Sequence, residues 1–299
     1  MRTLHTLVLG PLLGTLHWPP IQLARSSVVL VRLDVPSQRS LKPGERRTIG
    51  SCIVEHMGKS ITLERSSEPG NVQSEWDVSQ GCAPDYAGCI AEMALKALAS
   101  RPQRGGRVLM LGLGGGSIAG HILCGSTSID WTLRVTAVEA DGDVVTAAQE
   151  LFFPSMFGEN PRVDPAAEPN LRQRLRVLHA DAERVADGSV TLGDTSRPFD
   201  VIIEDFAYGS YGALGVPFWR SLRERHAAPD ATVLINTLYS HFTEMEHLAR
   251  DLRKAGWTNV RQRVNRGLQA SDGERKVVAP AEWRPGDNMI VSALNRGRS

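Results

Sequence analysis

The sequence has little of several features that mark other classes of protein. Its four cysteines form no CxxC pair, which argues against a disulfide framework and against a cysteine-ligated metal site. Its eight histidines are dispersed, so no metal ion is expected. The formal net charge is only +1 and the basic residues are scattered, so the chain lacks the basic patch typical of nucleic-acid binding and of membrane-surface binding.

The N-terminal segment also lacks a long apolar run. Residues 7–16 are apolar, but glycine and proline interrupt them and they are too few to cross a bilayer. Residues 1–33 contain arginine at positions 2, 25 and 32 and no acidic residue. This composition fits a mitochondrial transit peptide as well as an ordinary N-terminal strand and loop. Because the cysteines indicate reduced thiols, we expect a cytoplasmic protein, with mitochondrial targeting as the alternative.

What the sequence does have is a glycine-rich turn after a buried strand. The apolar residues 108–111 run into glycines at positions 112, 114, 115 and 116, and a helical pattern follows Ser117. Glycine permits left-handed backbone angles and lets a ligand approach the main chain, and the N–H groups at a helix start bind anionic or polar ligands. The turn therefore predicts a site for NAD, FAD or S-adenosylmethionine (SAM), with a merely close-packed turn as the alternative.

Four further apolar segments end in a polar residue. Strands are expected at residues 133–138, 174–179, 199–203 and 231–236, and the polar residues at their ends are Glu139, Asp181, Asp205 and Asn236. Ligands of open parallel sheets bind at the carboxyl ends of the strands, where an acid such as Glu139 can accept hydrogen bonds from ribose hydroxyls. For each acid the alternative role is to cap the following helix.

The remaining patterns place a small β domain before this sheet. Alternating segments at residues 51–55 and 60–64 predict a hairpin, and residues 86–99 predict a helix that leads into the first parallel strand. Residues 257–264 and 288–294 predict a terminal antiparallel hairpin. We therefore expect an N-terminal tail (1–33), a small β domain (34–85) and an α/β domain (86–299). The long connection 151–173 is rich in aromatics, which would form either a substrate wall or core.

Together these segments resemble the spermidine-synthase-like branch of the class I SAM-dependent transferases, over residues 48–294. The resemblance rests on Gly-Asn-Val-Gln at 70–73, the glycine turn at 112–117, Val-Glu-Ala-Asp at 138–141, Asp181-Ala182 and Asp205. It implies a Rossmann-like sheet with a terminal antiparallel hairpin, preceded by a small β domain, and a homodimer. The turn also resembles that of orphan spermidine-synthase-like proteins and of the C-terminal domain of the elongation-factor lysine and N-terminal methyltransferase.

Departures from the polyamine-synthase pattern favour methyl transfer. Polyamine synthases carry Gly-Gly-Gly-Asp-Gly-Gly at the turn, where this chain has Gly115 in place of the acid. Their Tyr-His-Glu signature reads Tyr-Ala-Gly at 86–88, and their Asp-Ser-Ser-Asp-Pro reads Asp-Phe-Ala-Tyr-Gly at 205–209. Without those acids the amines of a diamine and of decarboxylated SAM are left unpaired. Aminopropyl transfer from decarboxylated SAM is the first alternative, and a non-catalytic nucleotide-binding or interaction protein is the second.

The resemblance also assigns roles to residues. The expected catalytic residues are Asp205 and Tyr208. Asp205 would orient or deprotonate an amine acceptor, either a small molecule or a protein, and Tyr208 would line its pocket together with Tyr211 and Asn236. Glu204 is expected to be a structural neighbour, because adjacent strand residues point in opposite directions. The residues expected to bind SAM are Gln73, Gly112, Gly114, Gly116, Ser117, Glu139, Asp181 and Ala182.

Overall fold

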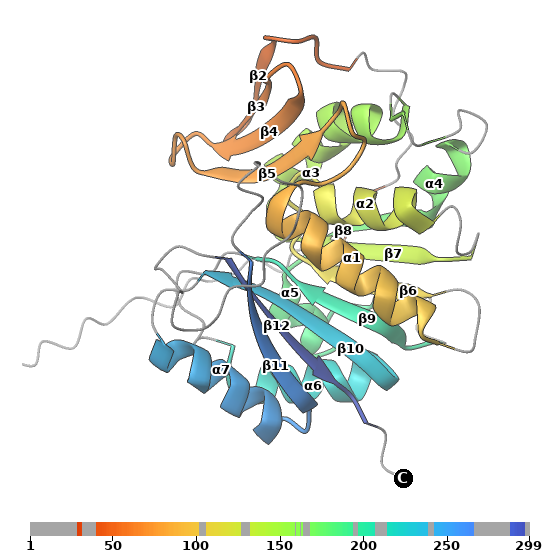
Figure 1. The fold of residues 1–299 in the computed structure, drawn as a ribbon, viewed down its shortest axis with the longest axis vertical. Helices are drawn as coiled ribbons and strands as arrows, with labels where there is room; N and C mark the ends of the chain where they lie inside the picture. The colour runs from red at the N-terminus through yellow and green to blue at the C-terminus, as the bar shows by residue number, and fades with distance from the viewer. Residues whose placement is uncertain are drawn as a thin grey trace, which may run out of the picture.

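The computed structural model of the protein shows two β-sheets and the helices that cover the larger one (Figure 1). The residues that it describes are 29–31, 40–101, 106–126, 132–158, 160–161, 163, 168–193, 197–206, 214–238, 242–265 and 288–296.

A large mixed sheet forms the centre of the molecule (Figure 1). Within the described residues it has eight strands in the order β1-β8-β7-β6-β9-β10-β12-β11. The strands from β8 to β10 run parallel, and they confirm the five strands predicted from apolar runs. Their bounds are β6 Arg107–Leu111, β7 Arg134–Glu139, β8 Leu175–His179, β9 Phe199–Glu204 and β10 Ala227–Leu238.

The strand order reverses beside β6. The chain continues from β6 to β7 and β8 on one side, and then returns to β9 and β10 on the other side. In open α/β sheets, the crevice at the carboxyl ends of the two strands that flank such a switch point is the usual ligand site. The fold therefore places the glycine turn after β6 and the acids after β9 at the same edge.

Apolar side chains of the parallel strands divide between two buried clusters. On β6, Val108 and Met110 belong to one cluster, whereas Leu109 and Leu111 belong to the other. Successive side chains of a strand point to opposite faces, so an uninterrupted apolar run fits a strand that is covered on both faces.

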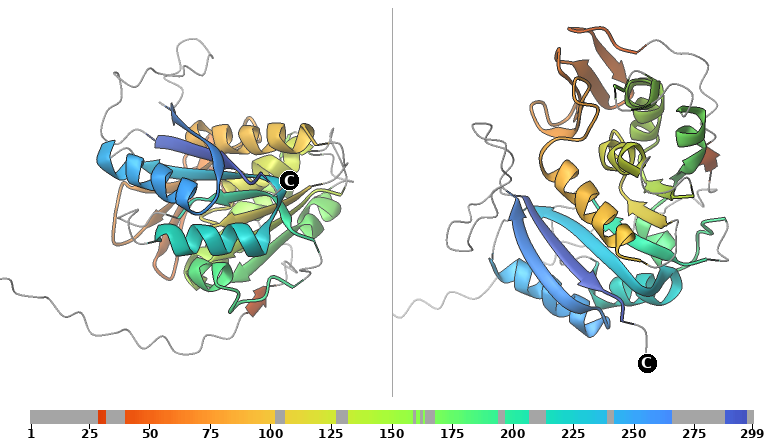
Figure 2. Two further views of the ribbon diagram at one scale, coloured as in Figure 1. Left: turned by 90° about the horizontal axis from the view of Figure 1, so that it is seen from below. Right: turned by 45° about the vertical axis from the view of Figure 1, so that its right-hand side comes forward.

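Helices cover both faces of the large sheet. One face is covered by α1 (Asp85–Ala99), α2 (Ser117–Gly125) and α3 (Gly142–Ala147), and the other by α5 (Ala182–Ala186), α6 (Gly215–His226) and α7 (Phe242–Lys254). The left view of Figure 2 shows α1 above the sheet and α6 and α7 below it.

The smaller sheet precedes α1. Its strands β2 (Arg46–Ile49), β3 (Cys52–His56), β4 (Ser60–Arg65) and β5 (Val72–Asp77) pair antiparallel in chain order. The predicted hairpin is β3 and β4, whereas β2 and β5 lack a clear alternating pattern. β5 owes its place to tertiary burial, because its Trp76 is fully buried beside Gly120 of α2.

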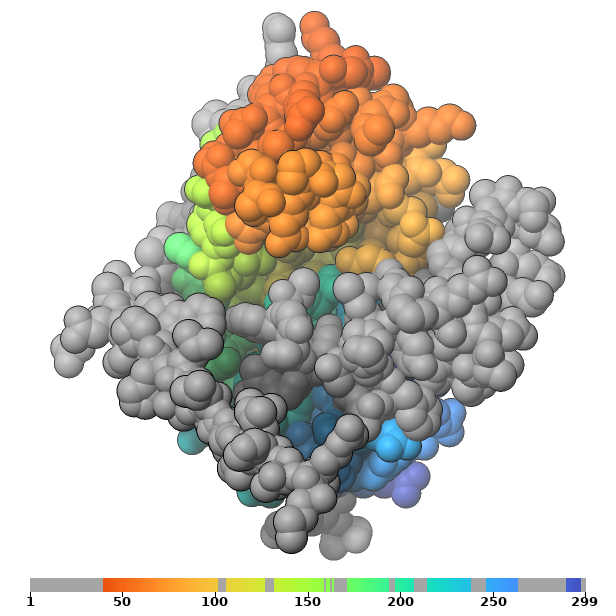
Figure 3. Space-filling view, turned by 90° about the vertical axis from the view of Figure 1, so that its left-hand side faces the viewer, coloured from red at the N-terminus to blue at the C-terminus, as the bar shows by residue number. Residues whose placement is uncertain are grey.

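The smaller sheet rests on the start of α3. In the space-filling view its orange residues lie directly on the yellow-green segment around that helix (Figure 3). Asp143 of α3 accepts a hydrogen bond from the backbone N–H of Ser51, with 2.8 Å between nitrogen and Oδ2. Asp141 caps the same helix by accepting from the N–H groups of Asp143 and Val144.

The aromatics of the long connection between β7 and β8 are core. Phe152, Phe153 and Phe157 are at most 1% exposed. They lie on or between two π-helical turns, η2 (Ala148–Phe152) and η3 (Pro154–Gly158), which precede α4 (Glu168–Arg174). The structure therefore decides between the two predicted roles, substrate wall and core, in favour of the second.

The edges of the large sheet are antiparallel. β12 (Asn288–Leu294) pairs with both β10 and β11 (Thr258–Asn265), which confirms the predicted terminal hairpin. At the opposite edge, β1 (Val29–Val31) pairs antiparallel with β8, so three residues of the predicted N-terminal tail belong to the large sheet. In the part of the chain that the structure describes, no helix has the length and apolarity that a membrane span requires.

Candidate functional site

The glycine turn joins β6 to α2 at the carboxyl edge of the large sheet. Gly112, Gly114 and Gly116 have left-handed φ angles of 87°, 53° and 83°, which glycine adopts without strain. A side chain at Gly112 would overlap the backbone carbonyl of Asp205. The backbone N–H of Asp205 in turn donates to the Leu111 carbonyl at 2.8 Å. The turn after β6 and the end of β9 therefore approach each other at the backbone level.

Other glycines of the turn make room for aromatic rings. A Cβ atom at Gly115 would lie 2.6 Å from the ring of Phe152, and one at Gly116 would lie 2.7 Å from the ring of Phe153. These two glycines are thus required by close contact with the rings of Phe152 and Phe153. The close packing that was the alternative interpretation is therefore present, and ligand binding at the left-handed turn stays a prediction.

The carboxylate of Glu139 lies directly on this turn. Its Oε2 accepts hydrogen bonds from the N–H groups of Leu113 at 2.9 Å and Gly114 at 3.4 Å. Its Oε1 accepts from the N–H of Asp141 at 3.0 Å. These backbone donors hold the carboxylate at the switch point. Oε2 already accepts from two N–H groups, whereas Oε1 accepts from one and keeps a lone pair for a ligand hydroxyl.

Strand β5 brings Gln73 and Ser74 to the same turn. The hydroxyl oxygen of Ser74 accepts from the Gly115 N–H at 2.8 Å, and the backbone oxygen of Gln73 would lie 3.8 Å from a Cβ atom at Gly114. The hydroxyl of Ser117, at the start of α2, is buried and has no hydrogen-bond partner among the described residues. The structure thus brings together Gln73, Glu139 and the predicted residues of the glycine turn.

Arg65, the last residue of β4, connects the small sheet to the large one. It pairs with Asp141 and donates to the hydroxyl of Ser51 at 3.1 Å and to Oε1 of Gln73 at 3.3 Å. Burial raises the pKa of Asp141, but hydrogen bonds from Arg65 and from the N–H groups at the start of α3 outweigh it and hold that pKa below its ordinary value.

Asp205 follows β9 and faces the β10 residue Asn236. The side-chain amide of Asn236 donates to Oδ1 of Asp205 at 2.8 Å. Although Asp205 is partly exposed as a residue, its carboxyl group is enclosed, and burial raises its pKa to about 7. The hydrogen bond from Asn236 opposes this shift, and the nearby charge of Glu139 adds to it. The carboxyl group therefore titrates close to neutral pH.

Glu204 precedes Asp205 and is fully buried. Burial raises the pKa of its carboxyl group well above the ordinary value, and the nearby charge of Asp205 adds to the shift. Its Oε1 accepts from the N–H of Phe206 at 3.3 Å, and its Oε2 has no partner in the described part of the chain. Alternation along β9 directs the two neighbouring acids to opposite faces of the sheet.

The adenine-side residues follow β8. Asp181 caps α5 by accepting from the N–H of Glu183 at 2.7 Å, and Ala182 is buried at the start of that helix. The capping role considered for this acid is thus present in the structure. Its proposed contact with adenine stays a prediction, and Tyr208 and Tyr211 lie outside the described residues.

Comparison with solved structures relates the whole architecture to two proteins. A probable spermidine synthase from Corynebacterium glutamicum is 18% identical with a TM-score of 0.56, and the match covers 87% of this chain and 82% of that chain. The spermidine synthase from Thermotoga maritima is 13% identical with a TM-score of 0.53, and the match covers 93% and 83%. This chain has the fold of the spermidine synthases. The predicted Rossmann-like fold, with its small β domain, is therefore confirmed.

Comparisons of the sequence alone relate this chain to known proteins over a short segment only. The profile of one family, the C-terminal domain of 1-Cys peroxiredoxin, matches residues 267–294, most of which lie outside the described residues. A search of curated proteins gives no match. The fold is therefore established by structure, whereas the reaction has to be argued from the residues of the site.

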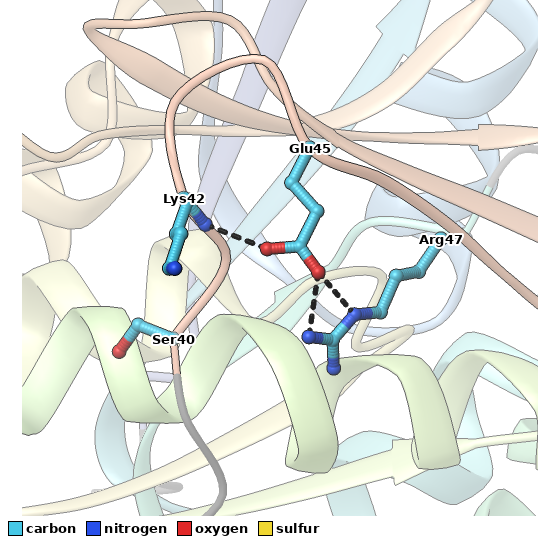
Figure 4. A pocket seen from close by; sticks show the side chains of 4 residues that line it. All are labelled: Ser40, Lys42, Glu45 and Arg47. Carbon is cyan, nitrogen blue, oxygen red and sulfur yellow. Dashed lines mark hydrogen bonds and ion pairs between the residues drawn. The ribbon is translucent and has the colours of Figure 1, made fainter.

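A surface pocket of about 380 Å³ lies elsewhere on this spermidine-synthase fold, at the start of β2 (Figure 4). Its lining residues are exposed or half-buried, and the Glu45 carboxylate accepts from the backbone N–H of Lys42 at 2.9 Å and from Nε of Arg47 at 2.8 Å. None of its lining residues belongs to the carboxyl edge of the large sheet, so the pocket is separate from the candidate site. No group of acidic, histidine or cysteine side chains among the described residues is arranged to hold a metal ion.

Sequence reasoning missed Arg65 and Ser74 as site residues. Ser74 was adjacent to a predicted residue, Gln73, and the alternation of a strand would place its side chain on the opposite face. Arg65 follows the predicted strand at residues 60–64, and nothing in the local pattern distinguishes it from a solvent-exposed arginine. Its importance follows from the contact with Asp141, which is 76 positions away in the chain.

Proposed function

We propose that the protein is a SAM-dependent methyltransferase that acts on an amine acceptor. The carboxyl group of Asp205 carries this proposal, because it titrates near pH 7 and stands at the strand edge beside Glu139. A general base is most effective when its pKa lies near the working pH. Asp205 is therefore suited to accept a proton from an amine nucleophile.

The residues around the glycine turn fit the cofactor. Oε1 of Glu139 offers an acceptor to a ribose hydroxyl, and the buried hydroxyl of Ser117 has no partner in the described part of the chain. Asp181 and Ala182 would lie on the adenine side, and Gln73 would close the site from the small sheet. When bound, SAM supplies a methyl group on a positively charged sulfur.

The chain's part in the reaction is alignment and proton removal. Methyl transfer requires the acceptor nitrogen to lie in line with the bond that breaks, and holding both partners in place lowers the barrier by several kcal/mol. Asn236 fixes the Asp205 carboxyl group through its hydrogen bond, so the base is held at the edge before the acceptor arrives. Tyr208 is proposed to line the acceptor pocket.

Gly115 favours methyl transfer over aminopropyl transfer. Polyamine synthases place an aspartate at the corresponding position, but here Phe152 lies 2.6 Å from where even a Cβ atom would be. An acidic side chain therefore does not fit at position 115 without displacing the ring. The site consequently lacks one of the acids that would bind the amine of decarboxylated SAM.

Calorimetric titration of the full-length protein with SAM, and separately with decarboxylated SAM, tests the proposal. We expect tighter binding of SAM. Glu139→Ala should weaken it at least about tenfold, because a charge-assisted hydrogen bond to the ribose is lost. Glu183→Ala, which removes an exposed acid from α5, should bind SAM like the wild type.

The other outcomes identify the alternatives. A preference for decarboxylated SAM would favour an aminopropyltransferase. Absence of binding with either compound would overturn both readings and favour a non-catalytic interaction protein. Location in the cytoplasm, absence of nucleic-acid and membrane partners, and assembly as a homodimer are part of the same proposal.

A further inference from the structure

Arg65 contacts residues of both sheets at their junction. Its guanidinium group contacts Asp141, Ser51 and Gln73, and its side chain is 25% exposed. Burial lowers the pKa of Arg65, but the hydrogen bond and charge of Asp141 outweigh burial and raise it, with a smaller contribution from the charge of Glu139. The guanidinium group is thus fully charged and lies close to the predicted ribose-binding acid.

The contact with Arg65 determines how the Gln73 amide is oriented. Nε of Arg65 donates to Oε1 of Gln73 at 3.3 Å, so the carbonyl end of the amide faces the arginine. The NH2 end, Nε2, then points elsewhere, and it has no hydrogen-bond partner among the described residues. An amide can present either its donor or its acceptor end to a ligand, and here Arg65 selects the donor end.

A donor is what a ribose site next to Glu139 requires. Ribose hydroxyls that donate to the Glu139 carboxylate keep lone pairs on their oxygen atoms, and those lone pairs accept a hydrogen bond from an N–H group. The backbone of Gln73 lies beside the turn, since its backbone oxygen would be 3.8 Å from a Cβ atom at Gly114. Its side chain contacts Arg65, which pairs with Asp141, two positions after Glu139. The acid and the amide are complementary in their hydrogen-bonding roles.

We propose that Arg65 is a positioning residue for the cofactor, which holds the Gln73 amide so that its NH2 group donates to a ribose hydroxyl oxygen. The inference rests on the proposed function, since it requires an adenosyl cofactor at this edge. Through Asp141, the same guanidinium group anchors the small sheet to α3 and thereby places Gln73 over the turn. Arg65 itself does not need to touch the cofactor.

The test is calorimetric titration of the full chain with SAM, together with thermal unfolding of each variant. Arg65→Lys keeps the positive charge near Asp141 and removes the Nε contact with Gln73. We expect this variant to bind SAM about fivefold more weakly, which corresponds to the loss of one hydrogen bond. The matched control is Arg47→Lys, which makes the same change at an exposed arginine of β2 and should bind SAM like the wild type.

Two variants of Gln73 separate positioning from a merely structural role. Gln73→Glu keeps an acceptor for Arg65 and replaces the NH2 donor with oxygen, so we expect weaker SAM binding with an undiminished unfolding temperature. Gln73→Ala and Arg65→Lys should be non-additive when combined, because both remove the same contact with the cofactor.

Several results would overturn the inference. If Arg65→Lys binds SAM as tightly as the wild type, a positive charge at position 65 is enough for binding and the contact with Gln73 is not needed. If Gln73→Glu binds SAM as tightly as the wild type, the NH2 group of Gln73 contacts no ligand. Additive losses in the double variant would show that the two residues act independently. If the wild type itself binds neither SAM nor decarboxylated SAM, the proposed function fails and this inference fails with it.

Discussion

Replacing Asp205 with asparagine should change how the stability of the protein depends on pH. In the folded protein, burial is the main cause that raises the pKa of this carboxyl group from 3.8 to about 7. The folded state therefore holds the proton more tightly than the unfolded state does. The stabilisation that this proton provides is complete below about pH 4, decreases as the pH rises, and is lost above about pH 7.

The size of the effect follows from the shift. One pKa unit corresponds to about 1.4 kcal/mol, so roughly 3 kcal/mol of unfolding free energy from this group is lost between pH 5 and pH 8. Asparagine has nearly the same shape and does not titrate, and its carbonyl oxygen can still accept from Asn236. The wild type should therefore lose roughly 3 kcal/mol relative to Asp205→Asn over this pH range.

Urea unfolding of both proteins at pH 5 and pH 8 measures this difference. The charge of Asp205 contributes to the raised pKa of Glu204, so the same comparison is repeated in a Glu204→Gln background, which removes the titration of Glu204 from both proteins. If the stability difference between wild type and Asp205→Asn is the same at both pH values, the Asp205 carboxyl group has an ordinary pKa. The argument that it is a base working near neutral pH would then be wrong.

Two further substitutions test the close contacts around the site. Gly115→Ala should lower the free energy of unfolding in urea by about 1 to 3 kcal/mol, because the new methyl group meets the Phe152 ring. Adding Phe152→Leu should recover part of that loss, and no recovery would contradict the steric explanation. Arg174→Met should cost about 3 kcal/mol or more, because the buried arginine donates to the Leu133 carbonyl at 2.7 Å and to the Ser126 hydroxyl at 2.8 Å. A loss below about 1 kcal/mol would mean that these acceptors find other partners.

Much of the fold could be predicted from the sequence, because its signals are local. Apolar runs indicated the five parallel strands, and glycines after the first of them indicated a left-handed turn. The alternation of the hairpin and the apolar face of α1 were equally visible. Strands β2 and β5 were not, because β5 is held by contacts such as that of Trp76 with α2 rather than by its own pattern.

The candidate site, like the fold, could be predicted only in part from the sequence. The sequence by itself placed Glu139 and Asp205 at the ends of strands, and parallel pairing necessarily brings such ends to one edge. Only the tertiary structure decided that Arg65 pairs with Asp141, that Phe152 closes the space at Gly115, and that Asp205 titrates near pH 7. Those properties depend on distance and burial among residues far apart in the chain, which local sequence patterns do not contain.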